Sequence, residues 1–433
     1  MKVFMLGWEF PPFISGGLGT ACYGLTKAMD KLGIEVTFVL PTMVDTDYTT
    51  HVRLLTPACR RPAGGSKSSA LKNVTFCAIK SPLQAYTTAD VYQQRMEEML
   101  WQKQKTLSPT TRFQGAMDYS GNMYEEVRRY AVVAAELAAA EHFDVVHAHD
   151  WMTYPAGIAV AKTRGKPLIV HVHSTEFDRS GEHVNQIIYD IEREGMERAD
   201  RVIAVSHFTR NIILSRYGIS SEKVEVVHNG VTRDGNGSRA LAESGIGKDE
   251  RIVLFLGRIT MQKGPEYFLQ AARRVLDVMD NVKFVMAGSG DLMHRAVEMA
   301  AELGIGHKVL FTGFLRGENV EMIYRMADLY VMPSVSEPFG IAPLEALNHD
   351  VPVIISKQSG VSEVLRHALK VDFWDVEEIA NKIVAVLKYP PLGETLANYG
   401  NFEVRRLRWK DTAQKCVSIY EEALSAPYST RMR

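Results

Sequence analysis

Short apolar runs recur along this chain, and stretches with helical spacing separate most of them. In the first half the predicted strands lie at 3–6, 36–40, 74–79, 145–149, 168–172, 202–205 and 224–227, with an Ala-rich helix at 121–140. In the second half they lie at 252–256, 282–287, 309–312, 329–332 and 353–355, with helices near 264–279, 291–304, 317–326 and 340–348. This alternation is typical of α/β proteins, in which helices cover parallel sheets.

The alternation of predicted strands and helices is interrupted once and then resumes, which predicts two domains. A chain of 433 residues is longer than one hydrophobic core usually serves, and its 46% hydrophobic residues can fill two. Residues 229–248 are rich in Asn-Gly and Asp-Gly dipeptides, which favour loops. We therefore predict domains at 1–235, with an insert at about 59–121, and at 236–405, followed by a final segment at 406–433.

Composition excludes several classes of protein. A formal net charge of −1 argues against a broad nucleic-acid surface. No apolar run reaches the roughly 18 to 20 residues of a membrane span, and the N-terminus lacks the pattern of a signal peptide. The four cysteines are far apart, which fits neither a disulfide framework nor a zinc site. A cytoplasmic protein with reduced thiols is expected, and the sequence does not indicate its oligomeric state.

Two cations and two acids follow predicted strands of the second half. Arg258 and Lys263 come after one strand, and Glu337 and Glu345 follow another. A diphosphate needs positive charge and forked donors, whereas carboxylates accept hydrogen bonds from sugar hydroxyls. The set therefore indicates a nucleotide sugar as the ligand. The alternative is a solvated basic loop together with one surface acid and one helical acid.

A glycine-rich turn containing Gly16, Gly17 and Gly19 follows the first strand and opens a helix. Paired glycines let backbone N–H groups approach an anion at a helix N-terminus. A tight strand-to-helix turn is an equally good interpretation. The turn is not the dinucleotide fingerprint, because Cys22 stands where the third glycine belongs, and this disfavours NAD.

Polar residues end two neighbouring strands of the first half, at His147-Ala148-His149-Asp150 and His171-Val172-His173. Ligands of parallel sheets bind at the carboxyl ends of strands, so Asp150 and His173 are site candidates. His147 and His171 lie further upstream and are expected in the core. The His-x-His spacing also suggests a metal, but the pattern supplies no third and fourth ligand.

A second short pattern, Asp45-Thr46-Asp47, matches the acidic pairs that some glycosyltransferases use to hold a cation. Acidic loops produce the same match by chance, and Arg258 and Lys263 already offer the charge that a metal would supply. We predict no required metal.

Taken together, these motifs resemble those of the retaining GT-B glycosyltransferases, the superfamily of bacterial glycogen synthases and sucrose-phosphate synthases. The resemblance covers nearly the whole chain. Its most specific segments are Gly257-Arg258 to Lys263-Gly264, Glu337-Pro338-Phe339-Gly340 with Glu345, Ser359-Gly360-Val361-Ser362-Glu363, and Val226-Val227-His228-Asn229-Gly230-Val231.

The resemblance implies two Rossmann-like domains, a nucleotide-sugar donor held by the second, a hydroxyl acceptor held by the first, and a final helix that crosses back. It implies no cofactor, and catalytic roles for Arg258, Lys263, Glu337 and His173; Asp150, at its strand end, is the further catalytic candidate. The donor would be bound by Gly16, Gly17, Arg258, Lys263, Glu337, Phe339, Gly340, Ile341 and Glu345. No covalent nucleophile is assigned.

The segments Trp8-Glu9-Phe10-Pro11-Pro12 and His147 to Trp151, together with the insert, resemble the glycogen and starch synthase branch. This implies glucose transfer from UDP-glucose or ADP-glucose to a glucan. That branch often carries a lysine in the first glycine loop, and this chain has none there. A lipid, phosphosugar or small-molecule acceptor is the alternative. A nucleotide-sugar epimerase and a non-catalytic sugar-nucleotide binding protein are the alternatives of other classes.

Overall fold

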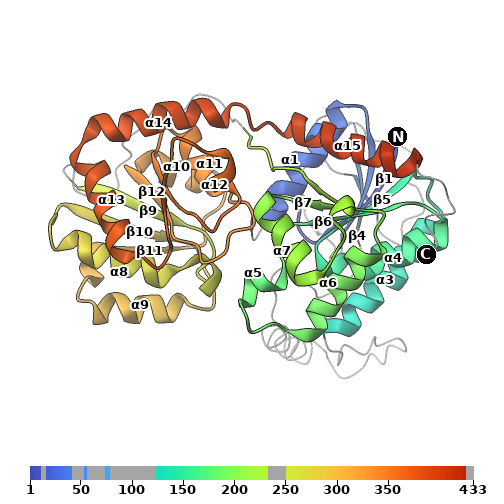
Figure 1. The fold of residues 1–433 in the computed structure, drawn as a ribbon, viewed down its shortest axis with the longest axis horizontal. Coiled ribbons are helices and arrows are strands. Elements are labelled where there is room, and N and C mark those ends of the chain that lie inside the picture. The colour runs from blue at the N-terminus through green and yellow to red at the C-terminus, as the bar shows by residue number, and fades with distance from the viewer. Residues whose placement is uncertain (11–15, 41–52, 56–73, 79–122, 233–249, 426–433) are drawn as a thin grey trace, which may run out of the picture. The chain divides into compact units, whose positions relative to one another are not determined.

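The computed structural model describes residues 1–10, 16–40, 53–55, 74–78, 123–232 and 250–425 (Figure 1). Contacts divide the chain into two compact units. The first comprises Met1–Val172, Asp190–Ile203 and Ala413–Arg433, and the second comprises His173–Tyr189 and Ala204–Thr412. The predicted domain boundaries differ from this partition and remain a prediction. Much of the predicted insert, and Asp45 to Asp47, lie outside the described residues.

The first sheet has eight strands in the order β3-β4-β2-β1-β5-β6-β7-β8. They span β1 (Lys2–Leu6), β2 (Glu35–Leu40), β3 (Arg53–Leu55), β4 (Val74–Ala78), β5 (Val145–His149), β6 (Leu168–Val172), β7 (Arg201–Ala204) and β8 (Val224–Val226). In the centre, β1 pairs in parallel with both β2 and β5. Buried residues fill β5 and β6 on both faces, as expected for strands covered by helices.

Helices connect these strands. They are α1 (Gly17–Lys31), α3 (Met123–Ala139), η1 (Trp151–Thr153), α4 (Tyr154–Arg164), α5 (Glu176–Ser180), α6 (Gln186–Arg198), α7 (His207–Tyr217) and η2 (Ser221–Lys223). Local chemistry sets several of their ends. Pro155 lies in the first turn of α4, and Gly165 caps that helix with φ 61°. Ser206 caps α7 by accepting a hydrogen bond from the backbone N–H of Thr209.

The second sheet has six strands in the order β11-β10-β9-β12-β13-β14. They span β9 (Arg251–Leu256), β10 (Val282–Ala287), β11 (Val309–Gly313), β12 (Leu329–Met332), β13 (Val353–Ser356) and β14 (Leu369–Val371). Its helices are η3 (Met261–Lys263), α8 (Pro265–Leu276), α9 (Met293–Glu302), η4 (Gly306–Lys308), α10 (Glu318–Met326), α11 (Ala342–Asn348), α12 (Val361–Val364), α13 (Val376–Lys388) and α14 (Pro390–Val404). The central strand β9 pairs in parallel with β10 and β12.

The α/β prediction is confirmed, and the strands expected from apolar runs are present within one or two residues. Two short strands of three residues each, β3 and β14, were not predicted. The helix expected at 340–348 begins at Ala342, since Gly340 has φ 102° and ends the preceding loop. Within the described residues, no helix combines the length and apolar character needed to span a membrane.

The last helix, α15 (Trp409–Ser425), begins in the second unit, and its residues from Ala413 onward belong to the first. Its Tyr420 is fully buried, with the phenol oxygen 2.5 Å from Nδ1 of His147 on β5. Cys416 on the same helix is also a buried free thiol. The helix therefore contributes to the core beside the first sheet, whose strands lie far earlier in the chain.

Candidate functional site

The loop after β9 holds Arg258 and Lys263 on a tightly supported backbone. Gly257 donates from its N–H to the carbonyl of Ala287 at 3.0 Å, joining the loop to the end of β10. At the other end Gly264 has φ 66°, and a Cβ there would lie 2.2 Å from the carbonyl oxygen of Pro333. Both cationic side chains keep part of their surface exposed. The Arg258 guanidinium also donates to the side-chain oxygen of Gln262 at 2.9 Å.

Lys263 forms an ion pair with Glu337, which follows β12. The Glu337 carboxylate also accepts a hydrogen bond from Ser334 at 3.4 Å and is only 7% exposed. Because the cation and the acid come from two neighbouring strands, the sheet itself brings them together. Sequence reasoning identified both residues but not that they touch.

The backbone around Glu337 is held by the Ser359-Gly360 turn after β13. The Glu337 N–H donates to the Gln358 carbonyl at 2.9 Å, and the Gly360 N–H donates to the Glu337 carbonyl at 2.9 Å. A Cβ on Gly360 would meet the Pro338 carbonyl oxygen at 2.3 Å, so this close approach requires glycine. Two of the predicted motifs therefore form one rigid substructure.

Glu345, in the first turn of α11, is held by a side chain that the sequence did not single out. The Tyr324 hydroxyl donates to its carboxylate at 2.9 Å. Burial raises the pKa of Glu345, and the hydrogen bond from Tyr324 partly opposes this shift. Burial and then the charges of Glu337 and Glu345 raise the pKa of Tyr330 well above its usual range.

The remaining donor-binding candidates differ in exposure. Phe339 is 3% exposed, and its ring lies 5.8 Å from the ring of His228, centroid to centroid. Gly340 has positive φ, and a Cβ there would lie 3.2 Å from Cγ of Glu337. Ile341 is partly exposed at the start of α11. The buried ring of Phe339 fits a supporting role in the loop, and ligand contacts by these three residues stay a prediction.

His173 belongs to the second unit, where the helix that follows it, α5, contacts η3. Burial lowers the pKa of His173 to about 3, although part of the residue is still exposed, so the imidazole is neutral at physiological pH. Asp178 of α5 accepts a hydrogen bond at 2.5 Å from the hydroxyl of Ser336. Ser336 directly precedes Glu337 in the sequence, so this bond joins α5 to the loop that carries Glu337. Sequence reasoning missed Asp178, whose only local signal was the capping box with Thr175.

Gly16, Gly17 and Asp150 belong to the first unit. Gly17 begins α1, and a Cβ built on it meets no atom of the described residues within 4 Å. Close by in the chain, Glu9 is buried and accepts a hydrogen bond from the Gly19 N–H at 3.2 Å. Asp150 is buried with φ 59°, an unusual backbone conformation for a residue other than glycine. The structure therefore divides the predicted site residues between the two units.

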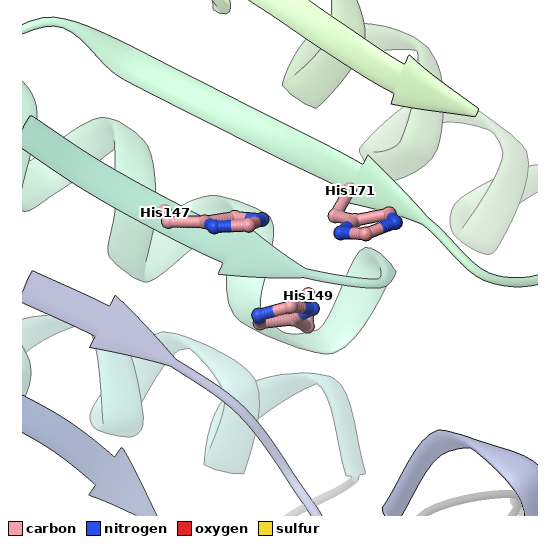
Figure 2. Close-up of side chains that lie close together, drawn as sticks. All are labelled: His147, His149 and His171. Atoms are coloured by element: carbon pink, nitrogen blue, oxygen red, sulfur yellow. The ribbon is translucent and has the colours of Figure 1, made fainter. Parts of the chain in front are cut away.

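Three histidines gather at the carboxyl ends of β5 and β6 (Figure 2). The ring centroids of His147 and His149 are 4.3 Å apart, which confirms that the His-x-His pair shares one face of its strand. His171 lies 5.3 Å from His147 and 5.2 Å from His149. All three rings are buried, as expected for His147 and His171. Their nitrogens lie close enough together to be considered as metal ligands.

Two family models match this chain. The model described as glycosyl transferases group 1 matches residues 238–402, and that of Glycosyltransferase Family 4 matches residues 112–234. An uncharacterized glycosyltransferase of Methanocaldococcus jannaschii is 28% identical over 98% of this chain and 99% of its own length. A D-inositol 3-phosphate glycosyltransferase of Catenulispora acidiphila is 29% identical over 67% of this chain and 75% of its own.

Solved structures share the two-sheet architecture. Sucrose-phosphate synthase from Thermosynechococcus elongatus superposes with a TM-score of 0.74 at 19% identity, covering 98% of this chain and 100% of its own. Anabaena HepE, solved in complex with UDP-glucose, gives a TM-score of 0.66 at 17% identity, with coverage of 98% and 100%. The loops that carry Arg258, Lys263, Glu337 and Glu345 lie within residues 238–402, the part of the chain that matches the model of group 1 glycosyl transferases, and the architecture of the chain is the GT-B fold.

Proposed function

We propose that this glycosyltransferase transfers a sugar, with retention of configuration and without a metal, from a nucleoside-diphosphate sugar to an acceptor hydroxyl. Arg258 and Lys263 bind the diphosphate, Glu345 accepts hydrogen bonds from the ribose hydroxyls, and Glu337 accepts them from the transferred sugar. We also propose that His173 contacts the donor sugar, that Gly16 and Gly17 approach the donor phosphates, and that Asp150 has a catalytic role.

The observation that carries this proposal is the ion pair between Lys263 and Glu337. In a nucleotide sugar the anionic diphosphate and the hydroxylated ring are joined by one bond. A bound donor therefore needs a cation and a hydroxyl acceptor side by side, as these two groups are. The donor would enter by exchanging the ion pair for two complementary contacts, phosphate with Lys263 and hydroxyl with Glu337.

The chemistry follows from where charge develops. When the nucleoside diphosphate departs, negative charge grows on its oxygens and the sugar acquires oxocarbenium character. Cations held on the rigid loop between Gly257 and Gly264 stabilise that charge without reorganising. The neutral imidazole of His173, with its pKa of about 3, can donate one hydrogen bond without adding a charge that repels the cationic sugar.

The acceptor has two candidates. A glucan follows from the motif resemblance to glycogen synthases, with UDP-glucose or ADP-glucose as donor. A phosphorylated polyol is favoured by the relatives named D-inositol 3-phosphate glycosyltransferase, which are 27–30% identical to this chain. The two differ in charge, so an acceptor panel separates them.

Release of nucleoside diphosphate from UDP-, ADP- and GDP-sugars, measured in EDTA, tests the proposal. Each donor is assayed alone, with maltooligosaccharides, and with inositol phosphate. We expect release that rises with one acceptor, and an anomeric proton coupling in the product that matches the donor. Isomerised sugar nucleotide from donor alone would instead identify an epimerase. Binding of a donor without turnover in the presence of either acceptor would identify a sugar-nucleotide binding protein.

Substitution of the paired residues tests their roles. We expect Lys263→Ala and Glu337→Ala each to lower kcat/KM by about 100-fold or more, the usual effect of losing one charge-stabilising group. Lys357→Ala is the matched control, because Lys357 pairs with Asp372 at the surface. Circular dichroism checks that each variant folds. A folded Lys263→Ala protein with the turnover of the control would contradict the assignment.

A further inference from the structure

Two groups of metal-ligating side chains occur in the described part of the chain, and their ring geometry separates them. In the buried group, the ring planes of His147, His149 and His171 are within 13–30° of parallel. An imidazole lone pair lies in its own ring plane, and Figure 2 shows the His149 ring displaced from the His147 and His171 rings, so the lone pair of His149 is not directed at a point between the other two. As folded, this group does not form a chelating site.

The second group comprises His207, His228 and Glu363, and its geometry is different. Their ligand atoms all lie within 4.8 Å of one another, and the two imidazole planes cross at 64° with centroids 6.0 Å apart. Nε2 of His228 and Oε2 of Glu363 are 3.3 Å apart. Two atoms bound to one tetrahedral zinc ion at about 2.1 Å are separated by about 3.4 Å. The pair already has the spacing of zinc ligands.

The carboxylate of Glu363 is fixed in position by the start of α7. It accepts backbone hydrogen bonds from His207 at 2.9 Å and from Phe208 at 2.6 Å. A carboxylate has about four lone-pair positions on its two oxygens, so the helix leaves acceptor capacity for a cation.

The group is also accessible. His207 is exposed, and the side chains of His228 and Glu363 keep 27% and 22% of their surface in contact with solvent. A cation can therefore enter, and water can occupy a fourth position. Two imidazoles and one carboxylate suit zinc better than magnesium or calcium, which prefer oxygen ligands alone.

We propose that His207, His228 and Glu363 form a zinc-binding site, separate from the residues assigned to the donor. The ion would join three segments: the start of α7, the loop after β8, and α12. The Ser206 and Thr209 hydroxyls already donate to the Pro338 carbonyl at 2.5 and 3.2 Å, and His228 lies beside Phe339. Bound zinc therefore braces the loop that carries Glu337.

Zinc binding is measured on untagged protein that has been stripped with EDTA and then freed of it. Zinc is titrated against a chromophoric chelator at neutral pH, for the wild type and for His207→Ala and His228→Ala. We expect one tight equivalent in the wild type, weakened at least about tenfold in each variant. His294→Ala is the matched control, because His294 is an exposed histidine on α9.

A spectroscopic measurement distinguishes this site from adventitious binding. Cobalt substituted at a four-coordinate site gives strong visible absorption, which both histidine variants should lose and His294→Ala should keep. His207→Ala retains the backbone N–H that holds Glu363, so it tests the ligand without removing the helix contact. The proposal is overturned if the wild type binds no zinc, or if the folded His207→Ala protein binds it as tightly as the control.

Discussion

At the scale of single residues, burial shifts the protonation equilibrium of ionisable groups in the candidate site. Glu345 is drawn toward its protonated form by desolvation, and the Tyr324 hydroxyl is the contact that opposes this shift most. A protonated Glu345 offers ribose hydroxyls a weaker acceptor than the carboxylate does. If Glu345 binds the ribose as proposed, the hydrogen bond from Tyr324 supports donor binding.

Removing that hydroxyl should change the pH dependence of the enzyme. In Tyr324→Phe the pKa of Glu345 rises further, so the carboxylate protonates at a higher pH as the solution is acidified. We expect the acid limb of kcat/KM for the donor to move to higher pH, with an increased KM near that limb. Tyr399→Phe, at an exposed tyrosine, is the control. Superimposable pH profiles for Tyr324→Phe and wild type would show that Glu345 is not needed in its ionised form.

At the scale of elements, the site depends on glycine turns where strands end. Gly264 lies between η3 and α8 with φ 66°, and its α-carbon faces the Pro333 carbonyl after β12. Gly288 follows β10 with φ 147°, and a Cβ there would lie 1.8 Å from the Gly257 carbonyl oxygen. These close approaches let neighbouring strand ends meet, which is how Lys263 reaches Glu337.

Alanine substitutions at Gly264 and Gly17 distinguish a glycine that the fold requires from one that is proposed to contact the donor. Gly264→Ala combines a left-handed backbone with a backbone clash, so we expect it to lower the free energy of unfolding by at least about 1–2 kcal/mol. At Gly17 the added methyl group meets no atom within 4 Å in the described part of the chain, so Gly17→Ala should change the free energy of unfolding by less than about 0.5 kcal/mol. Urea denaturation measures both.

Activity then tests the role proposed for Gly17. If its N–H approaches the donor phosphates, the added methyl group should lower kcat/KM in a protein as stable as the wild type. Full activity in Gly17→Ala would show that the glycine loop is a tight strand-to-helix turn and has no role in donor binding.

At the scale of the whole molecule, the last helix completes a core that begins at the first residues. Ala413, Cys416 and Tyr420 of α15 are fully buried, and Tyr420 contacts His147 across 273 positions of sequence. The first unit therefore cannot finish folding until the chain is almost complete.

A truncation after Thr412 tests this dependence. It removes Tyr420 and other buried side chains, each worth about 2–5 kcal/mol, against a typical total stability of about 5–15 kcal/mol. We expect hydrogen exchange to accelerate strongly in peptides covering β5, while β9 in the second unit stays protected and serves as the internal control. Equal protection of β5 in truncated and intact protein would contradict the inference.

The local pattern of the sequence was enough to predict the α/β class, most strands, and the loops that carry Arg258, Lys263, Glu337 and Glu345. Apolar periodicity and glycine chemistry act over a few residues, so they can be read without knowing the fold. The partners of those residues could not be predicted. Tyr324, Ser334 and Tyr420 carry no motif, and His207, His228 and Glu363 lie up to 156 positions apart. Which side chains meet depends on which strand ends become neighbours, and only the tertiary structure decides that.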